Sequence, residues 1–123
     1  NLSENKLNDA GIEQLAEVMP EMLELQELDL SATKFGVPGM ERLAVALPRC
    51  KKLRTLSLTM NKLKDAGIER LAEAMPTMLD LQELDLRETN CGERGLECLA
   101  AALPRCPRLQ KLDLRLNPNI GRM

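Results

Sequence analysis

The sequence contains no histidine, tryptophan or tyrosine, and Phe35 is its only aromatic residue. Histidine is the usual base of Ser–His and Cys–His pairs and the most common metal ligand, so we expect no enzyme activity, cofactor or metal. Large aromatic side chains normally contribute much of the apolar area of a core. Leucine, alanine and methionine must fill the interior instead, which suits a fold built from many small identical layers.

The chain also lacks an excess of charge and any long hydrophobic run. Lysine and arginine total 17 against 19 aspartate and glutamate, a formal net charge of -2, whereas nucleic-acid-binding domains usually carry a clustered basic excess. The apolar stretches, such as residues 43–47, are far shorter than the ~20 residues of a transmembrane helix. Residues 1–5 lack the basic start and apolar run of a secretory signal. We therefore expect no nucleic-acid or membrane partner.

A 28-residue period is present along the whole chain. Five positions of the period keep one residue type in every unit, without an insertion. They are Leu2, Leu30, Leu58, Leu86 and Leu114; Gly11, Gly39, Gly67 and Gly95; Leu15, Leu43, Leu71 and Leu99; Ala16, Ala44, Ala72 and Ala100; and Pro20, Pro48, Pro76 and Pro104. A register kept at five positions over four units indicates a repeat protein.

A second, 56-residue period is superimposed on the first. Residues 2–29 and 58–85 are identical at 21 of 28 positions. One diagnostic position alternates along the chain as Asn5, Thr33, Asn61, Thr89 and Asn117. Duplication of a two-repeat block explains this pattern, and so does a structural reason for two alternating kinds of unit.

Each unit joins a strand pattern to a helix pattern. Leucines alternate with polar residues in residues 81–86, the two-residue period of a half-buried strand. Apolar residues recur at helical spacing in residues 96–103 and form one stripe. Asp9 and Asp65 are suitable caps for the helices that they begin, and Pro38 suits a first helical turn. The prolines at positions 20, 48, 76 and 104 are expected to limit the helices.

A strand followed by a helix in every unit predicts a parallel sheet with right-handed connections. Strands stack ~4.8 Å apart, whereas packed helices lie ~8–10 Å apart. The helix layer is therefore the wider one, and the array must bend. We predict an α/β leucine-rich repeat solenoid with a concave parallel sheet and convex helices.

The units LQELDLRETNCGERGLECLAAALP and LRTLSLTMNKLKDAGIERLAEAMP resemble leucine-rich repeats of the ribonuclease-inhibitor subfamily. The resemblance covers residues 1 to about 117, and the spacing leaves room for a full helix. Thr33 and Thr89 depart from the pattern, because cysteine is common there in the subfamily. Similar repeats form the sensor regions of NOD-like immune receptors, Ran GTPase-activating protein and tropomodulin. The resemblance implies a horseshoe with a concave recognition face.

We expect one leucine-rich repeat domain over residues 1–123, with about four 28-residue repeats. The chain begins inside a strand motif, and its register breaks over residues 116–121. Solenoids normally need polar end caps, and neither end shows one. We therefore expect both ends to be truncated, with neighbouring repeats of a longer chain as partners.

The four cysteines fit a reducing compartment. Cys50 and Cys106 are two repeats apart, beyond the ~7 Å between Cα atoms that a disulfide allows. Both occupy a core position, as does Cys91, whereas Cys98 falls on the outer face of its helix. Unpaired thiols are typical of intracellular proteins, so we expect a cytoplasmic location.

The candidate binding residues are the polar positions of the strands, which alternation directs to the concave face. They are Glu27, Asp29, Thr55, Ser57, Thr59, Met60, Glu83, Asp85, Arg87, Lys111, Asp113 and Arg115. The first edge is acidic, the second strand is neutral, and the far corner is basic at Arg87, Lys111 and Arg115. Such variation on a uniform scaffold suits recognition of a protein partner, although an ordinary solvated strand surface is the alternative.

We hypothesise a protein-interaction or ligand-recognition module of a larger NOD-like-receptor-type immune or regulatory protein. Two alternatives are the leucine-rich repeat domain of a small-GTPase activator and a passive scaffold of stacked repeats. The sequence does not identify the partner.

Overall fold

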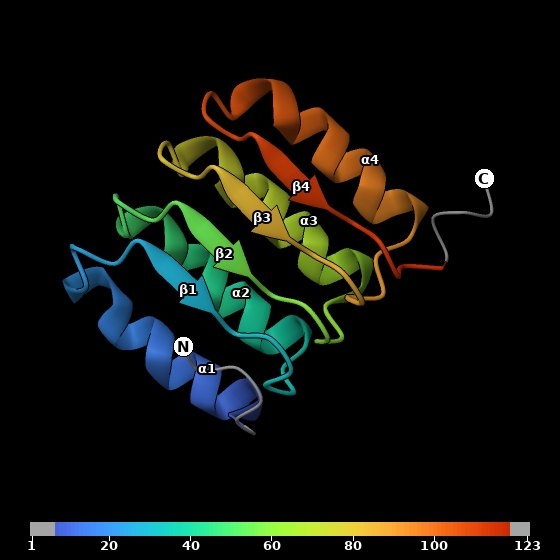
Figure 1. The fold of residues 1–123 in the computed structure, drawn as a ribbon. Helices are drawn as coiled ribbons and strands as arrows, with labels where there is room; N and C mark the ends of the chain where they lie inside the picture. The colour runs from blue at the N-terminus through green and yellow to red at the C-terminus, as the bar shows by residue number, and fades with distance from the viewer. Residues whose placement is uncertain (1–6, 119–123) are drawn as a thin grey trace.

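The computed structural model describes residues 7–118 as alternating helices and strands, with the sheet on one side and the helices on the other (Figure 1). The helices are α1 (Asn8–Val18), α2 (Val37–Ala46), α3 (Lys64–Ala74) and α4 (Glu93–Ala102). The strands are β1 (Glu27–Asp29), β2 (Thr55–Ser57), β3 (Glu83–Asp85) and β4 (Lys111–Asp113). A 3-10 turn follows each helix, as η1 (Met19–Glu21), η2 (Leu47–Arg49), η3 (Met75–Thr77) and η4 (Leu103–Arg105).

The strands form one parallel sheet in the order β1-β2-β3-β4. Each strand pairs with the next in a register of one repeat unit, so that Leu56 lies between Leu28 and Leu84. This open parallel sheet, with a helix between each strand and the next, confirms the predicted α/β repeat solenoid. No helix within residues 7–118 is both long and apolar enough to cross a membrane.

The core lies between the sheet and the helices. Leu56 and Leu58 of the strand layer and Leu43 and Leu71 of the helices are fully buried. Phe35, the only aromatic side chain, is also buried among aliphatic ones. Each unit therefore contributes a thin leucine layer to one continuous core, as the lack of aromatic residues predicts.

Each α-helix ends just before the proline of its unit, as predicted. Pro20, Pro48, Pro76 and Pro104 lie early in the 3-10 turns that follow the helices, where a missing N–H costs no α-helical hydrogen bond. Pro38 lies in the first turn of α2, which was also predicted.

Asp9 and Asp65 do cap helices, but the prediction that they cap the helices in which they lie is wrong. The N-cap residues Leu7 and Leu63 form no side-chain cap, and at the start of α1 it is Asn8 Oδ1 that accepts hydrogen bonds from the N–H groups of Ala10 (3.1 Å) and Gly11 (3.4 Å). Instead, Asp9 Oδ1 accepts hydrogen bonds from the N–H groups of Gly36 (2.9 Å) and Gly39 (2.8 Å) at the start of α2. Asp65 caps α4 in the same way, at 2.6 and 3.0 Å. Each aspartate therefore caps the helix of the following unit.

Buried asparagine joins the remaining pairs of units. Asn61 Oδ1 accepts hydrogen bonds from the N–H groups of Thr33 (3.1 Å) and Phe35 (3.4 Å) in the preceding unit. Its Nδ2 group donates to three carbonyls, including that of Leu30 at 2.8 Å. The shorter hydroxyl of Thr33 donates to the Leu30 carbonyl of its own unit. The alternation of Asn and Thr thus has a structural basis.

The four cysteines are free thiols. Cys50 and Cys91 are buried, and burial raises the pKa of Cys91 to about 11. Cys98, expected on the outer helix face, is half-buried beside the core. Cys106, expected in the core, is also only half-buried, because residues 7–118 contain no complete unit beyond its own.

Candidate partner-binding face

The sheet face consists of the outward side chains of β1–β4 and of the residues that follow each strand. In every strand the central leucine points into the core, and the two flanking residues point outward. The 28-residue register places equivalent residues side by side, so that Asp85 lies between Ser57 and Asp113. Two rows of polar side chains therefore cross the sheet.

A shallow groove of about 230 Å³ lies over β2, β3 and β4. It collects eight of the twelve residues predicted from the strand alternation, with Leu56 and Leu84 also in its lining. The eight are Thr55, Ser57, Glu83, Asp85, Arg87, Lys111, Asp113 and Arg115. The groove is thus built of short hydroxyl groups on one side and of long charged groups on the other.

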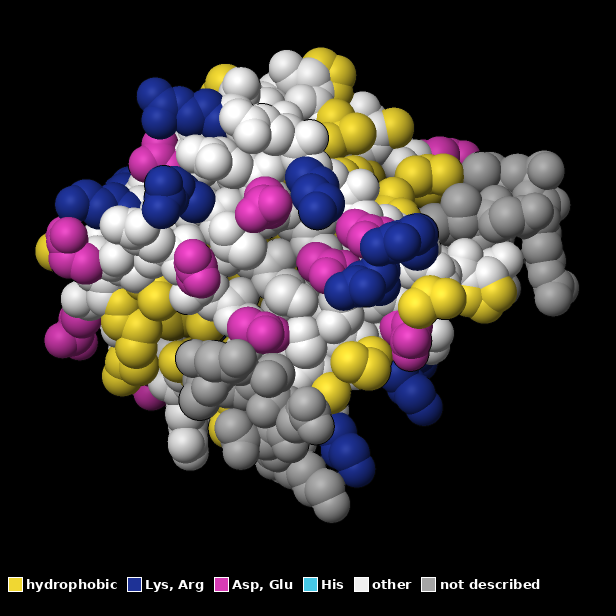
Figure 2. All heavy atoms as spheres, viewed as in Figure 1, with side chains coloured by type: hydrophobic (Ala, Val, Ile, Leu, Met, Phe, Trp, Pro, Cys, Tyr) yellow, Lys and Arg dark blue, Asp and Glu magenta, His cyan; other side chains and the backbone are white. Residues whose placement is uncertain are grey.

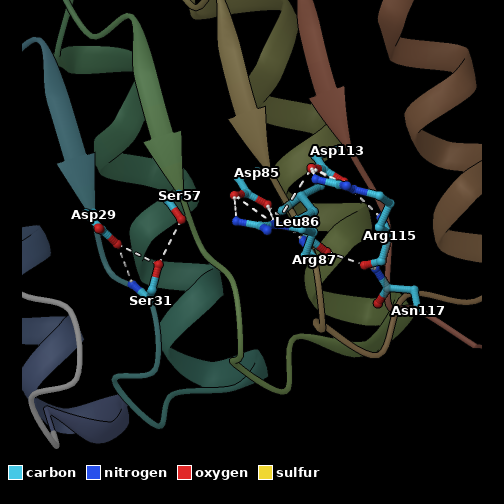
Figure 3. Close-up of polar contacts among 9 residues, drawn as sticks. All are labelled: Asp29, Ser31, Ser57, Asp85, Leu86, Arg87, Asp113, Arg115 and Asn117. Atoms are coloured by element: carbon cyan, nitrogen blue, oxygen red, sulfur yellow. Dashed lines mark hydrogen bonds and ion pairs between the residues drawn. The ribbon is translucent and has the colours of Figure 1, made fainter.

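The charged side of the groove is a network of ion pairs (Figure 3). Arg87 Nη2 lies 2.7 Å from Asp85 Oδ2, and its Nε lies 3.7 Å from Asp113 Oδ2. Arg115 Nη2 lies 2.7 Å from the same Asp113 oxygen. The expected basic corner is therefore largely neutralised by these aspartates. Strand alternation could have shown this, because residues two apart point to the same face.

A tight turn after each strand holds these pairs in place. Asp113 Oδ1 accepts a hydrogen bond from the backbone N–H of Arg115 at 3.1 Å, and Asp85 accepts one from Arg87 at 3.2 Å. Such aspartate turns are common where a strand ends. The side-chain hydrogen bonds of Arg115 with Asp113, together with the backbone one, lower the pKa of Asp113 to about 2. Asp113 therefore stays charged, and the turns orient both carboxylates before any partner arrives.

The other end of the sheet face is a hydroxyl network. Ser31 donates its Oγ hydrogen to Asp29 Oδ1 at 2.6 Å, and its Oγ lies 2.8 Å from Ser57 Oγ (Figure 3). Glu83 accepts a longer hydrogen bond from Thr55, at 3.4 Å. The sheet face therefore changes from hydroxyl groups to ion pairs along the array.

Four predicted residues lie outside the groove. Glu27 and Asp29 belong to the edge strand β1, with Glu27 exposed. The prediction that Thr59 lies exposed on the sheet face is wrong, because Thr59 is only 5% exposed. Threonine is short, and this unit has neighbours on both sides. Met60 is exposed, but it lies on the loop beyond β2 with a left-handed φ of 59°.

The family follows from a comparison of the sequence with family models. The model described as FBD-associated F-box protein At5g56370, LRR repeats, matches residues 19–123. The chain belongs to the leucine-rich repeat family. The predicted repeat is thereby confirmed at the level of the family, whereas the ribonuclease-inhibitor subfamily stays a prediction.

A solved structure shows the same leucine-rich repeat architecture. Leiomodin-1 actin-binding site 2 superimposes with a TM-score of 0.85 at 20% sequence identity, over 93% of this chain and 68% of that one. At this identity the likeness establishes a shared fold. The search of curated proteins found no match to the chain.

Proposed function

We propose that this leucine-rich repeat chain is a protein-interaction module whose sheet face holds the partner. The groove over β2–β4 supports this proposal, because it gathers side chains that differ from unit to unit on an otherwise uniform scaffold. Its ion pairs are fixed in advance by the aspartate turns. Prearranged charged groups of both signs favour specificity by rejecting partners with mismatched charges.

The finer assignment is a ribonuclease-inhibitor-type repeat domain of a NOD-like-receptor-type regulator in the cytoplasm. The 28-residue unit, with its full helix, and the buried Asn61 and Asn117 support the subfamily. The four free thiols support the compartment. A protein of this kind would need no catalytic residue of its own.

A charge-reversal experiment tests the sheet face. One bait carries Glu83→Lys with Asp85→Lys on β3, and a second carries Glu69→Lys with Glu73→Lys on α3. The two pairs match in net charge, and both disrupt surface ion pairs, since Asp85 contacts Arg87 on the sheet and both helix glutamates contact arginines. Proteins captured from cytoplasmic extract are then quantified by mass spectrometry, after circular dichroism has shown native helicity.

We expect the β3 variant to capture at least tenfold less of the partner than the native bait does. The α3 variant should capture an amount close to that of the native bait. Long-range steering changes equally in both variants, so the difference reports local contact. Equal loss from both variants, or loss from the α3 variant alone, would contradict binding on the sheet face. Capture of no protein by the native bait would favour the passive scaffold.

A further inference from the structure

A second depression lies on the loops that lead from the strands to the helices, away from the groove of the sheet face. Its volume is about 460 Å³, and its lining consists of Lys34, Phe35, Gly36, Met60, Asn61 and Lys62. It shares no lining residue with the groove over β2–β4. Hydrophobic side chains lie along this loop edge, at the lower right of Figure 2, with basic and acidic ones beside them. We call this depression the loop pocket.

Met60 occupies the loop pocket at an energetic disadvantage. It is 50% exposed and has a φ of 59°, a conformation that costs a non-glycine residue about 1 kcal/mol or more. An exposed methionine gains little from burial in return. Neither the core nor the backbone therefore explains a methionine at this position. A flexible thioether is, however, well suited to adapt to an incoming apolar side chain.

The loop pocket is also electrostatically one-sided. Lys34 and Lys62 are exposed, and within residues 7–118 the ion pairs of the structure include neither of them. No acidic residue lines the pocket. Asp9 accepts hydrogen bonds from Gly36 and from the next turn of α2, so its charge is already engaged with the helix start.

We propose that the loop pocket binds an aliphatic side chain of an acidic segment on a partner protein. The apolar group would contact Met60 above the Phe35 floor, while flanking carboxylates would meet Lys34 and Lys62. Lysine stems also present CH₂ groups to such a side chain. This interaction does not depend on the sheet face, because the two sites have no residue in common.

The test uses the 123-residue protein and the pentapeptide acetyl-DELED-amide, followed by NMR titration of the Met60 methyl and Gly36 amide signals. The peptides acetyl-DEGED-amide and acetyl-NQLQN-amide remove the apolar group and the charges, respectively. We expect saturable shifts at both signals, with affinity at least fivefold weaker for each control peptide. Equal binding of DEGED, or no shift at these two signals, would overturn the proposal.

Met60→Gly separates binding from folding. Glycine adopts a positive φ without strain, so this variant should unfold at an equal or higher denaturant concentration, yet bind DELED at least fivefold more weakly by the Gly36 signal. Leu116→Gly is the matched control, because Leu116 is the equivalent residue two units on, with a φ of 63° and 64% exposure. Retained affinity in Met60→Gly, or an equal loss in Leu116→Gly, would contradict the assignment.

Discussion

At the scale of single residues, a few buried polar side chains form hydrogen bonds with backbone groups that the leucine core cannot satisfy. Asn61 and Asn117 satisfy the backbone of the neighbouring loop with both ends of their amides. Within the part of the chain that the structure describes, no buried side-chain nitrogen or oxygen is left without a partner. Because an unmet buried group costs about 1–3 kcal/mol, these amides matter more to stability than their small number suggests.

Asp113 gives the first prediction, on pH dependence. Its pKa is lowered from the ordinary 3.8 to about 2, because Arg115 and then Arg87 favour the charged form. The carboxylate therefore contributes stability that is present above about pH 4 and is lost as the pH falls towards 2. Carboxyl ¹³C NMR titration should give a midpoint near 2, and Arg115→Gln should raise it. A native midpoint at 3.8 would contradict the pairing.

Residue-scale features were predicted unevenly from the sequence. Alternation correctly directed Glu83, Asp85 and Lys111 to the sheet face, because strand geometry is a local property. It misplaced Thr59, whose burial depends on the size of side chains in neighbouring units. The prediction of a basic corner at Arg87 overlooked Asp85, which lies two residues earlier on the same face and pairs with it.

At the scale of helices and strands, the boundaries follow the period closely. The helices end before the prolines, and the strands contain the expected leucines. The capping of the helices was missed for a clear reason. Capping rules consider residues three or four apart, whereas Asp65 acts on N–H groups 27 and 30 residues away. The sequence therefore identified aspartate as a capping residue but indicated the wrong helix.

The second prediction concerns this cap between units. Asp65→Ala should lower the free energy of unfolding by about 1 kcal/mol, the usual cost of losing a cap. The effect should appear at α4, where amide hydrogen exchange of Gly92 and Gly95 should become faster. Glu97→Ala, an exposed acidic residue in the middle of α4, is the control in urea unfolding. Equal effects of the two substitutions would exclude the proposed role of Asp65.

At the scale of the whole molecule, the units are joined by two alternating kinds of interface. Asp9 and Asp65 join α1 to α2 and α3 to α4, whereas Asn61 joins the β1–α2 loop to the following unit. Strand pairing is the same at every step. A unit is therefore matched to its neighbours by its polar side chains, and the true structural period is a pair of repeat units.

The third prediction follows from this period. A second copy of residues 30–85 inserted after Asp85 preserves the alternation, whereas a second copy of residues 58–85 places two Asn-type units together. The 56-residue insertion should raise the melting temperature, because a solenoid gains stability with each matched interface. The 28-residue insertion should melt lower than the 56-residue one and in more than one step. Equal melting of both variants would show that the leucine core alone sets the match between units.

The two kinds of interface also have a mechanical consequence. If the array is held at its two ends and stretched, each joint between units must give way in turn, and each rupture releases one unit of chain. Joints made through an aspartate at a helix start should resist a different load from joints made through a buried asparagine. In a single-molecule stretching experiment, the rupture force should therefore alternate between two values along the array. The pairing of the units would then be visible in the elasticity of the protein.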